Sequence, residues 1–267
     1  MAITEYIPGK RLKGPFPEDE RQIKLVVAYD GTDFFGYQKQ AHHETIQEHL
    51  ENALSKICNE PIVVYGISRT DAGVHAKGQI VSFFTTGSIP AENVARATIA
   101  FLPPTIVVRS AEEVPREWRA RHTMVGKEYV YRLHVSPVEN PITMRYHWHI
   151  KKSLSFDAMR EGATHLLGTH DFTTFKGANG NPTDPIRTIH SIDIRIEGES
   201  VTIHFIGDGF LYNMVRNLTG LLVDIGLGKR KASDVPKYIE ARDRKVIGKT
   251  APAKGLCLER VIFEEER

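Results

Sequence analysis

Residues 68–76 read SRTDAGVHA and place a guanidinium, on Arg69, two residues before a carboxylate, on Asp71. An ionised carboxylate can attack an electrophilic carbon or stabilise positive charge that develops there, and the small residues that follow let a substrate approach the backbone closely. The stretch lies between apolar runs at 61–67 and 80–84, so we expect it on a loop that joins two strands. A lone aspartate in such a loop is usually a turn former, so its surroundings decide between the two roles.

Arg216 is the second charged candidate and lies in GDGFLYNMVRN at 207–217, on a segment with an otherwise apolar helical face. Burial raises the pKa of a carboxyl group, whereas an adjacent guanidinium favours the charged form. Pairing with Arg216 would therefore keep Asp71 reactive, although an arginine on a helix is more often simply solvated. Two further clusters, YDGTDFFGYQ at 29–38 and GKTAPAKGL at 248–256, complete the set of candidate loops.

Length and composition limit what the protein can be. The 267 residues are enough for two domains, and 35 Lys and Arg residues nearly balance 33 Asp and Glu. The net charge of +2 does not by itself indicate a nucleic-acid partner, so any basic surface must be local. No apolar run approaches the roughly 20 residues that span a bilayer, and no signal peptide is recognisable. We therefore expect a cytoplasmic protein with no membrane contact, in which Cys58 and Cys257 are small buried thiols.

The order of helical and strand patterns repeats in the two halves and predicts an α+β fold. After a flexible leader at 1–21, an N-terminal domain at 22–114 and a C-terminal domain at 125–267 each follow the order strand, helix, strand, strand, helix, strand, with mainly antiparallel sheets that meet at a central cleft. In the first domain we expect strands at 22–30, 61–67, 78–85 and 105–113, and helices at 45–57 and 91–100. In the second we expect strands at 126–134, 190–197, 200–207 and 256–263, and helices at 155–167, 210–226 and 232–241.

The helix at 45–57 carries the strongest local signals. Its predicted apolar face consists of Ile46, Leu50, Leu54 and Ile57. Thr45 and Glu48 have the spacing of a capping box, which predicts side-chain hydrogen bonds at the start of the helix.

The four clusters, together with GKEYVYRL at 126–133 and RYHWH at 145–149, closely resemble the TruA family of tRNA pseudouridine synthases, and the resemblance extends from Ile23 to Phe263. It implies the pseudouridine synthase fold and an isomerase that converts uridine to pseudouridine at positions 38, 39 and 40, in the anticodon stem-loop of tRNA. It also implies a homodimer that uses no cofactor. The residues that match the family's functional positions are Asp71 as the nucleophile, Arg69 for displacing the target nucleotide, Tyr129 against the flipped base, Arg216 as the partner of Asp71, and Leu256 on the other side of the base.

Pseudouridine formation needs no redox partner and no energy source, because the bond from N1 to the sugar is exchanged for a bond from C5 to the same carbon. An aspartate can attack C1′ or assist departure of the base, and the sequence leaves both routes open. A uridine in a duplex must leave its stack at a cost of about a few kcal/mol, part of which an aromatic contact recovers. Tyr129 can supply that contact, although a tyrosine in an alternating strand usually packs in the sheet. Leu256 can equally be a core residue.

Two short stretches combine basic and aromatic residues and are predicted to contact the RNA backbone. Their basic residues are Arg116, Arg119 and Arg121, around Trp118, and Arg145, Lys151 and Lys152, near Tyr146 and Trp148. Contacts with phosphate give salt-dependent affinity and little sequence information, so the choice of base would come from shape and reach.

Two other functions remain compatible with these residues, namely a noncatalytic RNA-binding protein and an aspartate-dependent hydrolase of a small glycoside or nucleoside. Loss of Asp71 or Arg216 would indicate the former, and both are present. The latter would require a second carboxylate, and none accompanies Asp71 within its motif.

The remaining polar residues have plainer expected roles. Asp30 and Thr32 mainly shape a tight turn after the first strand, with support of the active loop as the alternative. His75 is expected to form hydrogen bonds in its loop. His147 and His149 face the same side of a strand but have no third ligand nearby, so no metal is expected.

The resemblance is incomplete at two places. Tyr37 occupies a position where the family commonly has Trp, which changes packing more than chemistry. The loop at 175–188 is less familiar, although Arg187 matches, so its contacts with RNA stay undefined.

Overall fold

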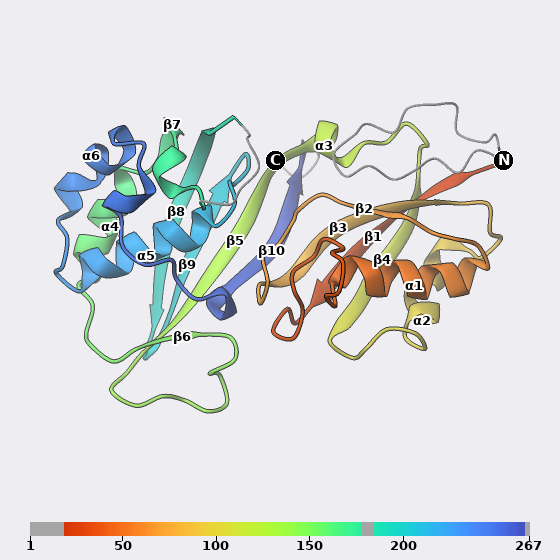
Figure 1. Ribbon diagram of the computed structural model, residues 1–267, viewed down its shortest axis with the longest axis horizontal. Coiled ribbons are helices and arrows are strands. Elements are labelled where there is room, and N and C mark those ends of the chain that lie inside the picture. Colours follow the sequence, from red (N-terminus) through yellow and green to blue (C-terminus); the bar gives the residue numbers. More distant parts are fainter. Residues whose placement is uncertain (1–18, 178–183, 265–267) are drawn as a thin grey trace.

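The computed structural model describes residues 19–177 and 184–264, and within them ten strands join in one mixed sheet (Figure 1). The fold is α+β, as predicted. The first half contributes β1 (Arg21–Tyr29), α1 (Ile46–Cys58), β2 (Val64–Gly66), β3 (His75–Thr85), α2 (Ala91–Thr98) and β4 (Ile106–Val114).

The second half contributes the longer set of elements. These are α3 (Ala120–Thr123), β5 (Met124–Val135), β6 (Trp148–Ile150), α4 (Phe156–Thr164), β7 (Gly168–Asp171), β8 (Ile186–Glu197), β9 (Ser200–Gly207), α5 (Met214–Gly226), α6 (Val235–Glu240) and β10 (Leu256–Phe263). Short 3₁₀ turns are η1 (Thr173–Phe175), η2 (Ala232–Asp234), η3 (Arg244–Val246) and η4 (Ala253–Gly255).

The last strand joins the two halves. The strand order is β4-β1-β3-β10-β5-β9-β8-β7, so β10 lies between β3 and β5. It runs antiparallel to β5 and parallel to β3, where His75 pairs with Cys257 and Ala76 with Leu258. Gly78 permits this close approach, because a Cβ there would lie 2.7 Å from the carbonyl oxygen of Glu259. The seam between β3 and β10 therefore sets how the N-terminal half sits against the C-terminal half.

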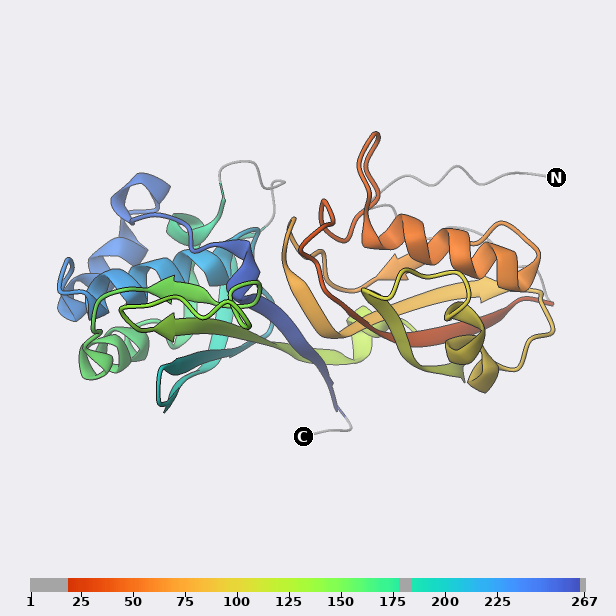
Figure 2. The same cartoon turned by 90° about the horizontal axis from the view of Figure 1, so that it is seen from below.

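The two long helices cover the same face of the sheet. Figure 2 shows α1 and α5 on one side of the strands, with β10 crossing between the halves. In α1 the predicted apolar face is buried at Ile46, Leu50 and Leu54, whereas Ile57 is half-buried and Cys58 takes its place in the core. Burial of apolar surface between these helices and the sheet stabilises the fold by about 25 cal/mol per Å². This packing supports the sheet from which the candidate loops extend.

The opposite face carries a smaller apolar cluster. Leu25 of β1 belongs to the main core, while its neighbour Val26 packs in the second cluster, because successive side chains of a strand point to opposite faces. Ile67, Trp118 and Phe263 belong to this second cluster.

Several predicted boundaries differ from the structure. The run at 61–67 pairs in the sheet only over β2, and the helix predicted at 210–226 begins at Met214, because Asn213 has a left-handed φ of 60°. Thr45 does precede α1, but its buried hydroxyl makes no capping hydrogen bond with a described residue. The strand β7 and the helix α3 were not predicted, since segments of four residues show no periodicity. The strand expected around His147 and His149 corresponds to β6, which spans only Trp148–Ile150.

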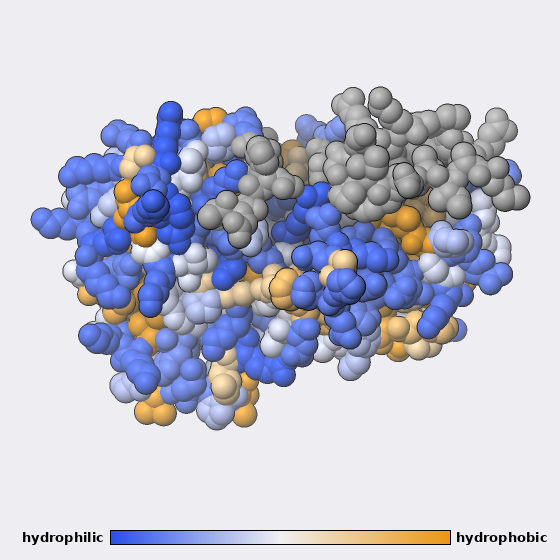
Figure 3. All heavy atoms as spheres, in the orientation of Figure 1, coloured by the Kyte–Doolittle hydropathy of each residue, from blue (hydrophilic) through white to orange (hydrophobic). Residues whose placement is uncertain are grey.

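The predicted leader at 1–21 lies outside the described residues as far as residue 18, and β1 begins at Arg21. The division into two domains stays a prediction, because the sheet is continuous. Cys58 and Cys257 are buried, as predicted. The face of the molecule seen in Figure 3 is mainly hydrophilic with scattered apolar patches. In the described parts of the chain no helix has the length and apolar character needed to cross a bilayer.

Candidate active site

Asp71 lies on the loop between β2 and β3, as predicted, and neighbouring backbone holds this loop in place. The Val74 N–H donates to the carbonyl of Asp71 over 3.1 Å, and the Gly73 N–H donates to the carbonyl of Phe34 over 3.3 Å. The Tyr37 N–H donates to the carbonyl of Thr70 over 3.1 Å. The YDGTDFFGYQ segment therefore supports the loop that carries Asp71, in addition to forming a turn.

Gly36 explains why a glycine is needed in that segment. Its φ is +90°, and a Cβ there would lie 2.8 Å from the carbonyl oxygen of Thr70. Any side chain at this position would push against the backbone of the loop. Tyr37, which follows, is buried beside Gly66, and an effect of its difference from the family pattern on packing stays a prediction.

Arg216 faces Asp71 across the seam, and the predicted pairing is confirmed. Its Nη1 donates to Asp71 Oδ2 over 3.3 Å, and the two side chains are 17% and 14% exposed. Two other bonds fix the guanidinium, because Nη1 also donates to Asn213 Oδ1 over 2.7 Å and Nε donates to the carbonyl of Ala251 over 2.8 Å. A partly desolvated charge pair is the kind of setting that tunes a reactive carboxylate.

Burial and charge act in opposite directions on Asp71. Burial raises the pKa of Asp71, whereas the charge of Arg216 and its hydrogen bond lower it, and the net pKa lies above the ordinary value of 3.8. Arg216 thus offsets only part of the cost of removing the carboxylate from water. A carboxylate of this kind is poorly solvated and so better able to react with an electrophilic carbon.

Tyr129 and Leu256 come from the adjacent strands β5 and β10. Tyr129 on β5 is 8% exposed and meets the ring of Phe210 edge-on, with ring centroids 5.4 Å apart. Burial raises the pKa of Tyr129, and the nearby carboxylate of Asp71 adds to this rise. Tyr129 therefore lies within electrostatic reach of Asp71. Leu256 opens β10 opposite Tyr131 and is 5% exposed, which agrees with core packing and leaves a base contact as a prediction.

Arg69 is exposed and makes no hydrogen bond or ion pair within residues 19–177 and 184–264. Lys151 and Lys152 are exposed after β6. These three side chains are thus accessible, as the predicted RNA contacts require.

The other predicted basic stretch is placed differently. Arg116 and Arg119 are half-buried, and Arg119 donates to the carbonyls of Arg116 and Trp118, each over 2.8 Å. Trp118 packs in the cluster on the face opposite α1 and α5. The side chain of Arg121 lies outside what the structure describes. RNA contacts by this stretch stay a prediction.

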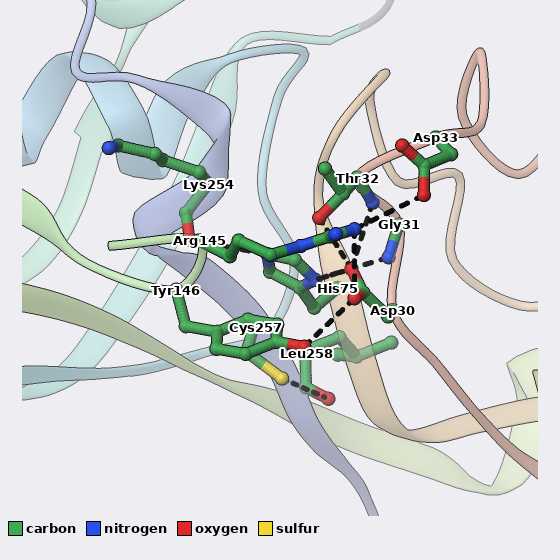
Figure 4. Close-up of polar contacts among 10 residues, drawn as sticks. All are labelled: Asp30, Gly31, Thr32, Asp33, His75, Arg145, Tyr146, Lys254, Cys257 and Leu258. Carbon is green, nitrogen blue, oxygen red and sulfur yellow. Dashed lines mark hydrogen bonds and ion pairs between the residues drawn. The ribbon is translucent and has the colours of Figure 1, made fainter. Parts of the chain in front are cut away.

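Sequence reasoning missed a cluster of polar contacts beside the Asp71 loop (Figure 4). Asp30 shapes the predicted turn by accepting from the Thr32 N–H over 3.0 Å, but it also accepts from the Tyr146 hydroxyl over 2.9 Å. Arg145, predicted to contact RNA, lies 3.1 Å from Asp33 and 3.6 Å from Asp30. No local pattern signals contacts between residues so far apart in the chain.

The predicted histidine pair does not share a ligand. His147 Nδ1 lies 3.1 Å from the carbonyl oxygen of Thr143, and His149 Nε2 lies 2.7 Å from that of Ser136. In the described part of the chain no three His, Cys, Asp or Glu side chains gather as a metal site. The loop at 175–188 lies partly outside the described residues, at 178–183, and Arg187 is on β8.

An α+β fold with one continuous sheet, a buried carboxylate on a strand-connecting loop and an arginine facing it from a helix matches what the resemblance implied for pseudouridine synthases. The family model described as tRNA pseudouridine synthase matches residues 25–122 and 163–264. The chain belongs to this family of isomerases.

Similar proteins agree with this assignment. The chain is 38% identical over 243 residues to tRNA pseudouridine synthase A of Acetivibrio thermocellus, covering 91% of this chain and 100% of the relative. It is 42% identical over 245 residues to tRNA pseudouridine synthase A 2 of Clostridium tetani, covering 91% and 99%. A chain of the archaeal box H/ACA sRNP Nop10-Cbf5 complex is 14% identical, with a TM-score of 0.35 over 75% of this chain and 44% of that chain. A likeness that low says nothing about function.

Proposed function

We propose that this protein isomerises uridine to pseudouridine in tRNA, at positions 38, 39 and 40 of the anticodon stem-loop, with Asp71 as the nucleophile. The observation that carries the proposal is the contact of 3.3 Å between Asp71 Oδ2 and Arg216 Nη1, both largely buried, in a member of this family. The names and nearly full-length match of the bacterial relatives support tRNA as the substrate.

The reaction balances without any other reactant. The bond from N1 to C1′ breaks, the base turns, and C5 bonds to C1′. C5 then loses its proton and N1 gains a proton, so the atoms balance. The carboxylate of Asp71 attacks C1′ or stabilises the positive charge that develops on the sugar, and Arg216 favours its charged form. In this proposal Arg69 displaces the nucleotide, and Tyr129 and Leu256 contact the base on its two sides.

Two further parts of the proposal rest on the resemblance. The protein works as a homodimer in the cytoplasm, and its exposed basic residues after β6 bind the phosphates of the tRNA. Analytical ultracentrifugation over a range of protein concentrations tests whether the protein is a homodimer.

The deciding experiment compares the wild-type protein with the variant Asp71→Asn on an unmodified anticodon arm. Mass spectrometry after derivatisation of pseudouridine measures turnover, and filter binding measures affinity. The variant should lose conversion and keep binding, because only the reactive oxygen is removed. The matched control is Asp193→Asn, which also breaks an Asp–Arg contact, of 2.7 Å to Arg195, but on an exposed strand. Normal turnover by Asp71→Asn would overturn the assignment.

The same assay separates the alternatives. A noncatalytic RNA-binding protein would bind the arm without converting it, and a hydrolase would release free uracil. Hydrolysis would require a second carboxylate as acid or base, and none accompanies Asp71 in SRTDAGVHA. This feature of the motif and the family membership favour the isomerase.

A further inference from the structure

His75, the first residue of β3, forms hydrogen bonds to both halves of the molecule (Figure 4). Its Nδ1 accepts from the Gly31 N–H over 3.1 Å, in the first half, and Asp30 Oδ1 lies 3.1 Å from the same nitrogen. Its Nε2 lies 3.2 Å from the carbonyl oxygen of Lys254, in the second half. A carbonyl oxygen only accepts hydrogen bonds, so Nε2 carries the hydrogen and donates.

The residue before His75 and the segment that contains its partner Lys254 each contact one member of the charge pair. On one side, Val74 precedes His75 and donates its N–H to the carbonyl of Asp71 over 3.1 Å. On the other side, Lys254 follows Ala251 by three residues, and the carbonyl of Ala251 accepts from Arg216 Nε over 2.8 Å. The hydrogen bond from His75 to Lys254 thus connects the segment that holds the Asp71 loop with the segment that holds the guanidinium of Arg216.

We propose that His75 is a positioning residue, whose hydrogen bond to Lys254 fixes the separation of Asp71 and Arg216. Backbone pairing at this point of the seam is short, consisting of His75 with Cys257 and Ala76 with Leu258. The side chain of His75 adds a cross-link just where the loop carrying Asp71 ends. The expected effect of His75 on turnover rests on the proposed function. Its expected effect on the separation of Asp71 and Arg216 does not.

The segment between β5 and β6 restricts the orientation of the His75 ring. The ring of Tyr146 meets that of His75 edge-on, with centroids 5.2 Å apart, and the Tyr146 hydroxyl donates to Asp30 over 2.9 Å. Lys254 Nζ donates to the carbonyl of Met144 over 2.8 Å, so the same segment also holds the partner on the other side. Figure 4 shows the side chains of Asp30, His75 and Tyr146 converging from three parts of the chain, while the Lys254 side chain points away from them.

His75 is suited to positioning and not to proton transfer. Its side chain is 8% exposed, and both ring nitrogens already have partners. Burial lowers the pKa of His75, while the charge of Asp30 partly opposes this. A buried ring with both nitrogens engaged has no atom left to exchange a proton with a substrate.

Two substitutions distinguish the hydrogen bond made by Nε2 from the one made by Nδ1. In His75→Gln the amide nitrogen is as many bonds from Cα as Nε2 and can still donate to Lys254. In His75→Asn the amide oxygen takes the place of Nδ1, so the contact with Gly31 survives and the contact with Lys254 is lost. We expect His75→Asn to lower kcat about tenfold with KM changed by less than about twofold, and His75→Gln to restore most of kcat.

A second readout does not depend on catalysis. In protein labelled with ¹³C-aspartate, the Asp71 carboxyl signal, assigned through Asp71→Asn, reports its pKa. His75→Asn should raise that pKa further, because Arg216 moves away from the carboxylate, and His75→Gln should leave it near the wild-type value. If the wild-type protein converted no uridine, this titration would still decide the role of His75.

The control for substituting a buried histidine is His134→Asn. His134 is also buried, and its Nε2 lies 3.1 Å from the carbonyl oxygen of Val138, a local contact away from the seam. It should leave kcat and the Asp71 titration unchanged. The proposal is overturned if His75→Asn titrates like the wild type at Asp71, or if His75→Gln shifts that pKa as much as His75→Asn does.

Discussion

Ala251 and Arg216 hold each other by two hydrogen bonds. The Ala251 N–H donates to the carbonyl of Arg216 over 3.2 Å, and Arg216 Nε donates to the carbonyl of Ala251 over 2.8 Å. The bond through Nε restricts the guanidinium, whose Nη1 donates to Asp71 and Asn213. The chain before β10, which looks like a connecting segment, thus aims the cation of the candidate site.

This arrangement requires the forked shape of arginine. In Arg216→Lys the charge remains, but a single ammonium cannot reach both Ala251 and Asp71. We expect kcat to fall by about tenfold or more, with KM changed by less than about twofold. Steady-state kinetics on an anticodon arm measures this. Arg160→Lys, in an exposed contact of 3.4 Å with Asp157, is the control, and equal activity of the two variants would contradict the prediction.

Asp71 should make stability depend on pH. Because its folded pKa is raised above the ordinary 3.8, ionisation of Asp71 costs more in the folded protein than in the unfolded chain. The stability that its protonated form contributes is complete below 3.8 and is lost as pH rises through the folded pKa. Asp71→Asn should therefore gain free energy of unfolding relative to the wild type as pH rises toward about 7. Urea unfolding at several pH values measures this, and a difference independent of pH would refute it.

Gly36 offers a test of the support given to the Asp71 loop. Gly36→Ala places a Cβ 2.8 Å from the carbonyl oxygen of Thr70, and Gly198→Ala, at a similarly positive φ of +60°, meets nothing within 4 Å. Gly198→Ala should lose about 1–2 kcal/mol of stability from the left-handed backbone, and Gly36→Ala should lose more because of its contact with the Thr70 carbonyl. Only Gly36→Ala should also lose activity, because only it displaces the loop. Thermal unfolding and turnover measured on the same samples check this, and equal activity would count against it.

Tyr129 is expected to act through its ring. Tyr129→Phe keeps the edge-on contact with Phe210, whereas Tyr129→Leu removes the aromatic surface. Stacking of a base on an aromatic side chain contributes about 1–3 kcal/mol. Tyr129→Leu should thus lower kcat/KM by about tenfold or more, and Tyr129→Phe by much less. Similar losses in both variants would point to the hydroxyl instead.

Much of the site could be predicted from the sequence, because motif residues carry their chemistry locally. SRTDAGVHA identified Asp71 on a strand-connecting loop, and the apolar face around Arg216 identified its helix. What escaped prediction depends on distant contacts. The hydroxyl of Tyr146 reaches Asp30 across 116 residues, and nothing near either position signals that bond.

The elements that were missed have similar physical explanations. The strand β7 (Gly168–Asp171) is too short for an alternating pattern and forms because it can pair with β8. The capping bond expected of Thr45 competes with burial of its side chain, which is fully enclosed. Local propensity predicted the residue at which α1 begins, but tertiary packing buried the Thr45 side chain and left the capping hydrogen bond unformed.

The place of β10 in the sheet also bears on how the enzyme is made. A ribosome releases β3 and β5 long before residues 256–263, so the two halves of a growing chain have no strand to join them. Without residues 256–263 the strand that pairs with both β3 and β5 is missing, so the seam across which the aspartate and the arginine lie 3.3 Å apart is incomplete. Under the proposed role of Asp71, a polypeptide that stops before residue 256 should therefore not convert uridine.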